Sequence, residues 1–356
     1  MNQRYLWVLL FGLLLSTSGY GQSASMAQAR QIFEDFAERN QIPGTAVAVW
    51  KDGEIIWSAG LGYADLEQRV PVDAARTKFR IGSVSKPLTA AALGVLYESG
   101  KIDLDAPIQK YVPGFPQKKY PISLRQLAGH TAGIRHYRGD EFLSSRRYDS
   151  VAAGLSIFQD DTLLFEPGTK YAYSSYGWNL ISAAIEEASG TDFLTYMKTA
   201  VFEPLKMTNT TADYTDRLIP FRSRWYQKDV GGVVGPAPYV DNSYKWAGGG
   251  FLSTVEDLIR FGAAHLEGEI LQPETVSLWT TSQQRTDGTF TDYGIGWRSG
   301  TTDAGYQWIG HSGGSVGGVT QFVIYPEERV IVIMLTNLSP VRYDQAHHKI
   351  AACFLE

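Results

Sequence analysis

The sequence is poor in cysteine: Cys353 is the only one among 356 residues, which excludes an internal disulfide and a cysteine-based metal site. Basic residues are also in the minority, with 32 Lys and Arg against 37 Asp and Glu, so the formal net charge is −5. A surface of this charge does not attract a nucleic-acid backbone or an anionic membrane. The six histidines, including His130, His136 and the pair His347-His348, show no metal-ligand spacing. We therefore expect no metal, no other cofactor and no nucleic-acid partner.

A long hydrophobic run is missing as well. The apolar stretch 6–15, interrupted only by Gly12, follows the single basic residue Arg4, and it is shorter than the roughly 20 residues that span a bilayer. Small and polar residues come next, a pattern typical of a secretory signal peptide. We expect a signal peptide over residues 1–21, cleavage before Gln22, and an exported protein, periplasmic or secreted, with no stable membrane insertion. An uncleaved membrane anchor is the alternative.

Both ends of the remaining chain predict one β-sheet. Apolar runs and turn residues indicate five strands, at 44–50, 54–59, 308–312, 319–325 and 330–336. Helical periodicity over 27–40 and 344–355 predicts a helix at each end of the chain, covering the sheet.

The middle of the chain is mostly helical. Helices are expected over 88–98 and 178–188, from Ser123 to near Gly133, and from Ser253 to His265, the last two opened by capping boxes. The fold class is therefore α+β: an antiparallel five-stranded sheet flanked by N- and C-terminal helices, with a large, mostly helical insertion. No linker-like segment interrupts the chain. We expect a single domain over 22–356, with a sheet part (22–82 and 290–356) and a helical part (83–289).

Ser83 and Lys86 stand three residues apart at the start of the first inserted helix, so their side chains share one face. A serine hydroxyl needs a base to become a nucleophile, and a lysine serves only if its ammonium is destabilised. The helix start also offers free N–H groups to an oxyanion. Alone, this spacing is common, and Ser83 as a helix cap beside a solvated Lys86 explains it equally well.

Two further motifs favour a catalytic role for Ser83 and Lys86. Tyr173-Ser174-Ser175 precedes a helix, where a phenol can relay protons. The segment 310–314, Gly-His-Ser-Gly-Gly, borders a strand, where glycines let a substrate approach and a free N–H can complete an oxyanion hole. Taken singly, these motifs also fit a core tyrosine with a serine cap and a glycine bulge.

The three motifs in this order resemble the serine β-lactamase and penicillin-binding-protein superfamily, which includes D-Ala-D-Ala carboxypeptidases, and particularly its class C-like branch. The resemblance covers nearly the whole mature chain: 79–86 looks like the nucleophile segment, 122–134 like a second landmark, and 167–175 like the tyrosine loop. Segments 133–137 and 239–254 look most like the mitochondrial serine β-lactamase-like branch. We suspect a bacterial, exported relative of that branch, with a β-lactamase/transpeptidase-like fold.

The resemblance implies roles for seven residues. Ser83 would be acylated, Lys86 would accept its proton, and Tyr173 would relay protons. The N–H groups of Ser83 and Gly314 would hold the oxyanion. The remaining three residues would bind substrate: His311, Ser312 and Ser175.

Two of these positions depart from many relatives, since His311 replaces a lysine and Ser175 an asparagine. Both departures occur in the mitochondrial-type branch and weaken the case for antibiotic breakdown, although Lys245 or Arg135 could restore the charge. We therefore expect a serine hydrolase that cleaves peptides, amides or esters through a Ser83 acyl-enzyme. This expectation includes D-Ala-D-Ala carboxypeptidase activity and peptidoglycan-derived substrates. The expected β-lactamase activity is weak at most.

Two other interpretations remain. A catalytically weak fold of this family could serve as a binding or assembly module, because fold does not fix function. The segment 313–317 also matches the Gly-x-Ser-x-Gly elbow of α/β-hydrolases. That elbow lies between a strand and a helix, whereas a strand is expected to follow here, which speaks against it. The sequence does not indicate an oligomeric state.

Overall fold

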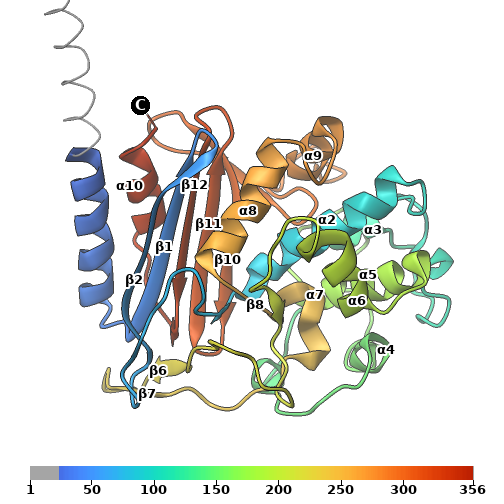
Figure 1. The fold of residues 1–356 in the computed structure, drawn as a ribbon. Coiled ribbons are helices and arrows are strands. Elements are labelled where there is room, and N and C mark those ends of the chain that lie inside the picture. The colour runs from blue at the N-terminus through green and yellow to red at the C-terminus, as the bar shows by residue number, and fades with distance from the viewer. Residues whose placement is uncertain (1–23, 356) are drawn as a thin grey trace, which may run out of the picture.

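The computed structural model describes residues 24–355 and places a β-sheet beside a helical region (Figure 1). The expected α+β architecture is confirmed. The predicted signal peptide, and the cleavage point before Gln22, lie outside the described residues. Within residues 24–355, no helix has both the length and the apolar character needed to cross a membrane.

The main sheet is antiparallel and has seven strands in the order β3-β2-β1-β12-β11-β10-β9. Its strands are β1 (Gly44–Lys51), β2 (Glu54–Asp65), β3 (Val70–Pro71), β9 (Arg298–Thr301), β10 (Gln307–Ser315), β11 (Gly318–Tyr325) and β12 (Val330–Thr336). The prediction of five strands is therefore wrong in number. The five expected strands form the continuous centre, and the two additional strands are short pieces at the edges, which lack a run of alternating or apolar residues.

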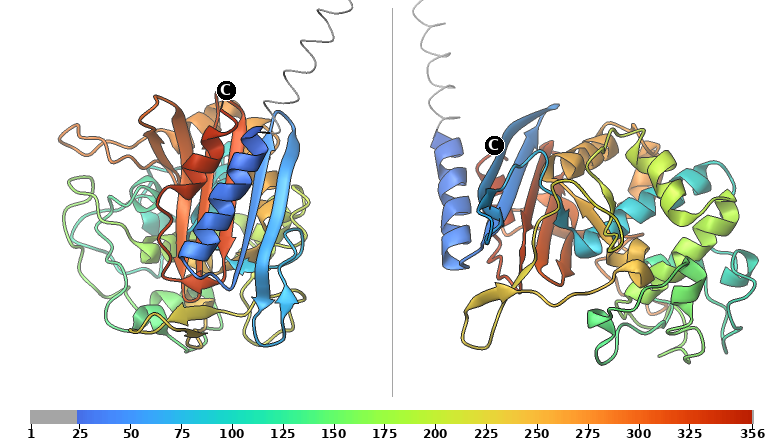
Figure 2. Two further views of the ribbon diagram at one scale, coloured as in Figure 1. Left: turned by 90° about the vertical axis from the view of Figure 1, so that its left-hand side faces the viewer. Right: turned by 60° about the horizontal axis from the view of Figure 1, so that its bottom comes forward.

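Helices cover both faces of the sheet. The helix at 24–39 and α10 (Ala346–Ala352) lie across one face (Figure 2), and α8 (Val255–Leu266) lies on the other. Accordingly β12, Val-Ile-Val-Ile-Met-Leu-Thr, is buried along its whole length. Strands covered on both faces read as continuous apolar runs, which explains why the central strands were recognisable from sequence.

The helical region lies between β4 (Phe79–Arg80) and β9 in the chain and packs against the side of the sheet. Its remaining helices are α2 (Ser85–Glu98), α3 (Leu124–Ala128), α4 (Val151–Leu155), α5 (Ser175–Ser189), α6 (Phe193–Met197), α7 (Trp246–Gly249) and α9 (Pro273–Thr280). Short 3-10 helices are η1 (Gly82–Val84), η2 (Ile108–Lys110), η3 (Glu141–Leu143) and η5 (Ser243–Lys245), and η4 (Lys198–Phe202) is a π-helix.

Two small sheets complete the fold. One has the order β4-β8-β5 and the other β13-β6-β7. Their strands are β4 (Phe79–Arg80), β5 (Thr211–Ala212), β6 (Tyr226–Lys228), β7 (Val234–Pro236), β8 (Phe251–Ser253) and β13 (Leu338–Ser339). A single hydrophobic cluster extends from β1 and β12 through α8 to α2 and α5, so the sheet and the helices share a core.

Several helix ends differ from the sequence prediction, three of them for an evident reason. The Ser123–Gln126 capping box is present, but α3 ends at Ala128 instead of near Gly133. Thr254, not Ser253, caps α8 by accepting the backbone N–H of Asp257. The last helix begins at Ala346, because Asp344 and Gln345 both have positive φ angles, which an α-helix does not allow.

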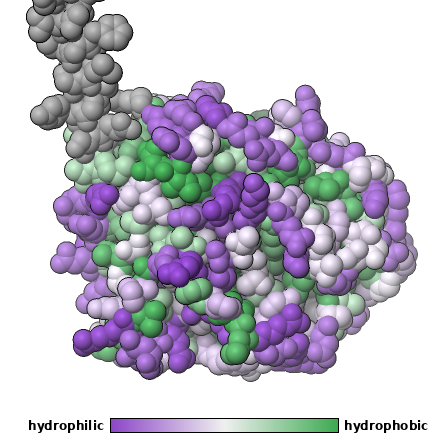
Figure 3. Space-filling model, viewed as in Figure 1, coloured by the Kyte–Doolittle hydropathy of each residue, from purple (hydrophilic) through white to green (hydrophobic). Residues whose placement is uncertain are grey.

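On the face shown in Figure 3, hydrophobic residues lie in small groups between hydrophilic ones.

Candidate active site

Ser83 lies where the helical region meets the sheet. It is the middle residue of η1, it is partly exposed, and α2 follows directly. This turn packs closely against β10: a Cβ on Gly82 would lie 2.6 Å from the carbonyl oxygen of Gly314, and one on Gly313 would lie 2.0 Å from that of Ile81. Glycines on both segments thus allow the two backbones to touch, and they bring Ser83 beside the strand that carries Gly314.

Lys86 is fully buried beneath Ser83. Its Nζ lies 3.0 Å from Ser83 Oγ, 3.1 Å from Ser175 Oγ and 2.6 Å from the carbonyl oxygen of Gly248. Burial, followed by the charges of Lys245 and Arg298, lowers the pKa of Lys86 well below its usual value. A neutral amine can donate two hydrogen bonds and accept a third, so this geometry suits a base that accepts the Ser83 proton.

Tyr173 lies beside the same two residues. Its ring centre is 4.8 Å from Lys86 Nζ, and its hydroxyl shares a hydrogen bond with Ser83. Burial raises the pKa of Tyr173 far above its usual value, although the hydrogen bond to Ser83 opposes this rise. The phenol is therefore protonated and can donate. The His130 ring packs against Tyr173 with the centroids 4.2 Å apart, which fixes the phenol in place.

The strand β10 offers an open edge next to Ser83. Its neighbour β9 pairs with it only as far as Gly310, and Ser312 and Gly314 beyond that point are exposed. A Cβ on Gly313 would lie 3.1 Å from the backbone nitrogen of Ser83, so β10 runs directly past the nucleophile. An acyl group at Ser83 would therefore meet the N–H groups of both segments.

His311 points away from this edge. It is 3% exposed; its Nδ1–H donates to the carbonyl of Ser312 (2.6 Å), and its Nε2 accepts from the Tyr293 hydroxyl (2.8 Å). Burial, with a further contribution from Lys86, lowers its pKa well below the usual value. Both ring nitrogens are thus occupied in a neutral ring, which leaves Ser312 as the side chain of this motif that faces the open edge.

Ser175 is the first residue of α5 and is also buried. Its hydroxyl contacts Lys86 and shares a hydrogen bond with Tyr137, and its N–H donates to His136 Nδ1 at 3.2 Å. The helix cap at this position is Ser174, whose Oγ accepts from Gly177 N–H. The Ser175 hydroxyl is therefore hydrogen-bonded to Lys86, the residue placed to act as the base. All seven residues singled out in the sequence lie around Ser83, but Ser175 and His311 are directed toward protein groups.

Arg298 was missed by the sequence analysis. It is the first residue of β9, it is exposed, and its guanidinium lies 5.8 Å from the ring centre of Tyr293. Its charge lowers the pKa of both Lys86 and His311. It forms no ion pair or hydrogen bond through its side chain within the part of the chain that the structure describes. The signal that could have identified Arg298 is a basic residue shortly before the strand that carries the Gly-His-Ser motif.

Arg135 does not provide the missing charge. Its guanidinium is buried in an ion-pair network with Glu141, at 2.7 Å, and with Asp161. Lys245 is buried near Lys86 and is considered below.

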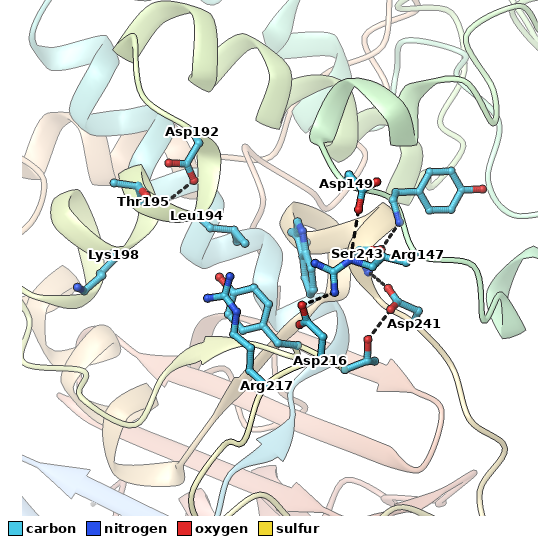
Figure 4. Close-up of a pocket in the computed structure, with 14 residues that line it drawn as sticks. Arg147, Asp149, Asp192, Leu194, Thr195, Lys198, Asp216, Arg217, Asp241 and Ser243 are labelled. Atoms are coloured by element: carbon cyan, nitrogen blue, oxygen red, sulfur yellow. Dashed lines mark hydrogen bonds and ion pairs between the residues drawn. The ribbon is translucent and has the colours of Figure 1, made fainter.

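A separate pocket of about 380 Å³ lies away from Ser83 (Figure 4). Within it, Arg147 pairs with Asp216 at 2.5 Å and with Asp149 at 3.3 Å. Among the described residues, no group of three or more His, Cys, Asp or Glu side chains is placed to hold a metal ion.

An α+β fold with a buried lysine and a tyrosine converging on a helix-start serine defines the β-lactamase and penicillin-binding type of serine hydrolase. Comparison with known families agrees: the Beta-lactamase family model matches residues 29–354, and the chain belongs to this family.

Known relatives support the same assignment. The human mitochondrial serine beta-lactamase-like protein LACTB is 30% identical over 437 residues, covering 93% of this chain and 80% of that protein. Penicillin-binding protein 4* of Bacillus subtilis (strain 168) is 29% identical over 340 residues, covering 90% and 74%. The octameric penicillin-binding protein homologue from Pyrococcus abyssi has the same fold, with a TM-score of 0.80 at 24% identity, covering 93% of this chain and 77% of that one. The resemblance to the mitochondrial-type branch is confirmed.

Proposed function

We propose that this protein is a serine hydrolase that cleaves small peptides, amides or esters through an acyl-enzyme on Ser83. The observation that carries the proposal is the contact of 3.0 Å between Ser83 Oγ and the Nζ of a lysine that is fully buried and lacks a carboxylate partner within residues 24–355. A solvated lysine would stay protonated, whereas burial shifts this one toward the neutral form that can act as a base.

The reaction follows from the positions of the three side chains. Neutral Lys86 takes the Ser83 proton as Oγ bonds to the substrate carbonyl carbon, and the oxyanion is held by the N–H groups of Ser83 and Gly314. Tyr173 donates its proton to the leaving nitrogen or oxygen as the scissile bond breaks, and Lys86 returns the serine proton to Tyr173. Water then attacks the acyl carbon by the same proton path, which releases the acid and restores Ser83.

The charge and exposure of Arg298 suggest that the preferred substrate carries a carboxylate. The exposed guanidinium of Arg298 forms no ion pair or side-chain hydrogen bond within residues 24–355, and Arg298 pairs with Gly310, where the open edge of β10 begins. By contrast, Lys86 and Lys245 are buried and Arg135 is paired. A guanidinium binds a carboxylate through two parallel hydrogen bonds. Peptides that end in a free carboxylate, peptidoglycan-derived ones included, fit this arrangement.

Replacing Arg298 with glutamine is expected to lower kcat/KM for a D-amino peptide with a free C-terminus by about 10- to 100-fold, since a charge-assisted contact contributes about 1.5–3 kcal/mol. Turnover of a neutral p-nitrophenyl ester should change less than threefold in alkaline buffer, where Lys86 is neutral in both proteins and the charge of Arg298 no longer affects the base. Steady-state kinetics with both substrates measure this. Equal losses on the two substrates would rule out carboxylate recognition by Arg298.

β-Lactams are expected to be poor substrates. Ser175 is bound to Lys86 and Tyr137, so its short hydroxyl cannot anchor the side-chain amide of a β-lactam, and neutral His311 adds no charge. With Arg298 left to hold the carboxylate, the lost amide contact lowers acylation by about one to two powers of ten. Hydrolysis of nitrocefin, measured beside a D-amino peptide and a p-nitrophenyl ester, decides this. Nitrocefin turnover at the rate of a dedicated β-lactamase would contradict it.

The remaining proposals concern the cellular setting. Residues 1–21 have the pattern of a signal peptide, so we place the enzyme outside the cytoplasmic membrane, periplasmic or secreted, as a single domain acting on small peptide or ester substrates.

A further inference from the structure

Lys245 is a buried lysine that forms no ion pair in the part of the chain that the structure describes. Five Lys or Arg residues in the described part of the chain are buried: Lys78, Arg80, Lys86, Arg135 and Lys245. The first four are held by hydrogen bonds or ion pairs, such as Lys78 to Asn209 at 2.7 Å and Arg80 to Asp213 at 2.7 Å. Lys245, only 2% exposed, forms no side-chain hydrogen bond or ion pair within residues 24–355. A lysine this deep in the protein without an acid beside it is unusual, so its position suggests a role.

Aromatic rings surround this ammonium. Lys245 Nζ lies 4.3 Å from the ring centre of Phe142, 5.1 Å from that of Tyr244 and 5.6 Å from that of Tyr137. The negative faces of aromatic rings attract a cation, so the three rings compensate in part for the missing water. They do not neutralise the charge, whose field therefore extends into the protein.

One layer of side chains separates Lys245 from the base. Tyr137, whose ring faces Lys245, shares a hydrogen bond with Ser175, and Ser175 Oγ is 3.1 Å from Lys86 Nζ. The same short segment also carries Gly248, whose carbonyl accepts from Lys86 Nζ at 2.6 Å. Two like charges this close in a low-dielectric interior each disfavour protonation of the other.

We propose that Lys245 acts through Lys86 as a positioning residue of the reaction proposed above: its ammonium keeps the Lys86 amine unprotonated and able to take the Ser83 proton. Here His311 is neutral where many relatives carry lysine, and Lys245 supplies the second cation from a different element. Burial, and then the charge of Arg80, lowers the pKa of Lys245 itself to about 7, so Lys245 carries its charge below about pH 7 and loses it above.

Other charged groups near the pair leave this coupling in place. The acids close to Lys245 are engaged elsewhere: Asp213 with Arg80 and Asn242, and Glu141 with Arg135. Further titratable and charged groups interact with one of the two lysines or with the residues between them. They are Arg80, His130, His136, Tyr137, Glu141, Tyr173, Asp213, Tyr244, Arg298 and His311.

The test is an NMR titration of the full-length protein carrying ¹³Cε-labelled lysine, which reads the protonation of each lysine whether or not a substrate is turned over. In Lys245→Met, the midpoint of Lys86 is expected to rise by about one pH unit. Lys245→Gln, a second neutral variant, should give the same rise. It measures the same interaction should Lys245→Met fold poorly.

Two controls separate charge from packing. Lys245→Arg keeps a cation and should leave the Lys86 midpoint at or below its wild-type value, and Lys78→Met removes a buried lysine that does not act on Lys86 and should leave it unchanged. An unchanged Lys86 midpoint in Lys245→Met, or an equal rise in Lys245→Arg, would overturn the inference. Ester hydrolysis by the wild type tests the proposed function separately. In an active enzyme, the acidic limb of kcat/KM should move upward with the Lys86 midpoint.

Discussion

Ser83→Ala is expected to reduce hydrolysis of a p-nitrophenyl ester by at least about 10⁴-fold, because the acyl-enzyme cannot form without the hydroxyl. The fold should be unaffected, since Ser83 is partly exposed and its side chain contacts the catalytic groups Lys86 and Tyr173. Wild-type protein should react covalently with a fluorophosphonate probe, and the variant should not. Intact-mass analysis measures the label, and circular dichroism checks the fold.

Ser85→Ala is the matched control. Ser85 lies two residues further along, it is fully buried, and its Oγ accepts the backbone N–H of Phe251 at 3.3 Å. This variant should lose some stability while keeping its activity and its label. Ester hydrolysis by Ser83→Ala close to the wild-type rate would remove Ser83 as the nucleophile. A wild-type protein that neither turns over nor takes the label would favour the binding or assembly role instead.

Lys86→Met should lower kcat/KM by about 10²- to 10⁴-fold, the usual contribution of a general base. Methionine resembles lysine in length, so the protein should fold, at a cost of about 1–3 kcal/mol because the Gly248 carbonyl loses its hydrogen bond. Because hydroxide must then deprotonate Ser83, activity of the variant should rise about tenfold per pH unit in alkaline buffer, whereas the wild type levels off once Lys86 is neutral.

A pH–rate profile of both proteins on the same ester measures this difference, and Lys78→Met serves as a control for the loss of a buried lysine. If Lys86→Met kept the wild-type rate at neutral pH, another group would have to be the base.

Much of the catalytic centre could be predicted from local sequence. Ser83 and Lys86 are one helical turn apart, so their contact depends on a few neighbouring residues. The central strands were also recognisable, because burial on both faces gives unbroken apolar runs such as Val330–Thr336.

What the sequence did not reveal depends on contacts between distant segments. Arg298 lies on a four-residue edge strand and gains importance only by standing beside His311 and Tyr293. Lys245 lies among the rings of Phe142, Tyr137 and Tyr244, and only the fold brings the first two of these rings to it. The inward orientation of His311 follows from its bond to the Tyr293 hydroxyl, 18 residues away. No spacing rule predicts these relationships.

The pairing of β1 with β12 has a consequence for biosynthesis. Gly44 donates its N–H to Asn337, 293 residues later, and the turn that holds Ser83 rests on Gly314 of β10. A ribosome that has not yet made β10 has produced the proposed nucleophile and its base, but not the strand proposed to hold the oxyanion. Until β12 emerges, β1 has an unpaired edge, which is prone to mispairing with other chains. The proposed hydrolytic activity therefore requires that β10 to β12 have been made, and a chain that stops before them carries Ser83 without the strand it needs.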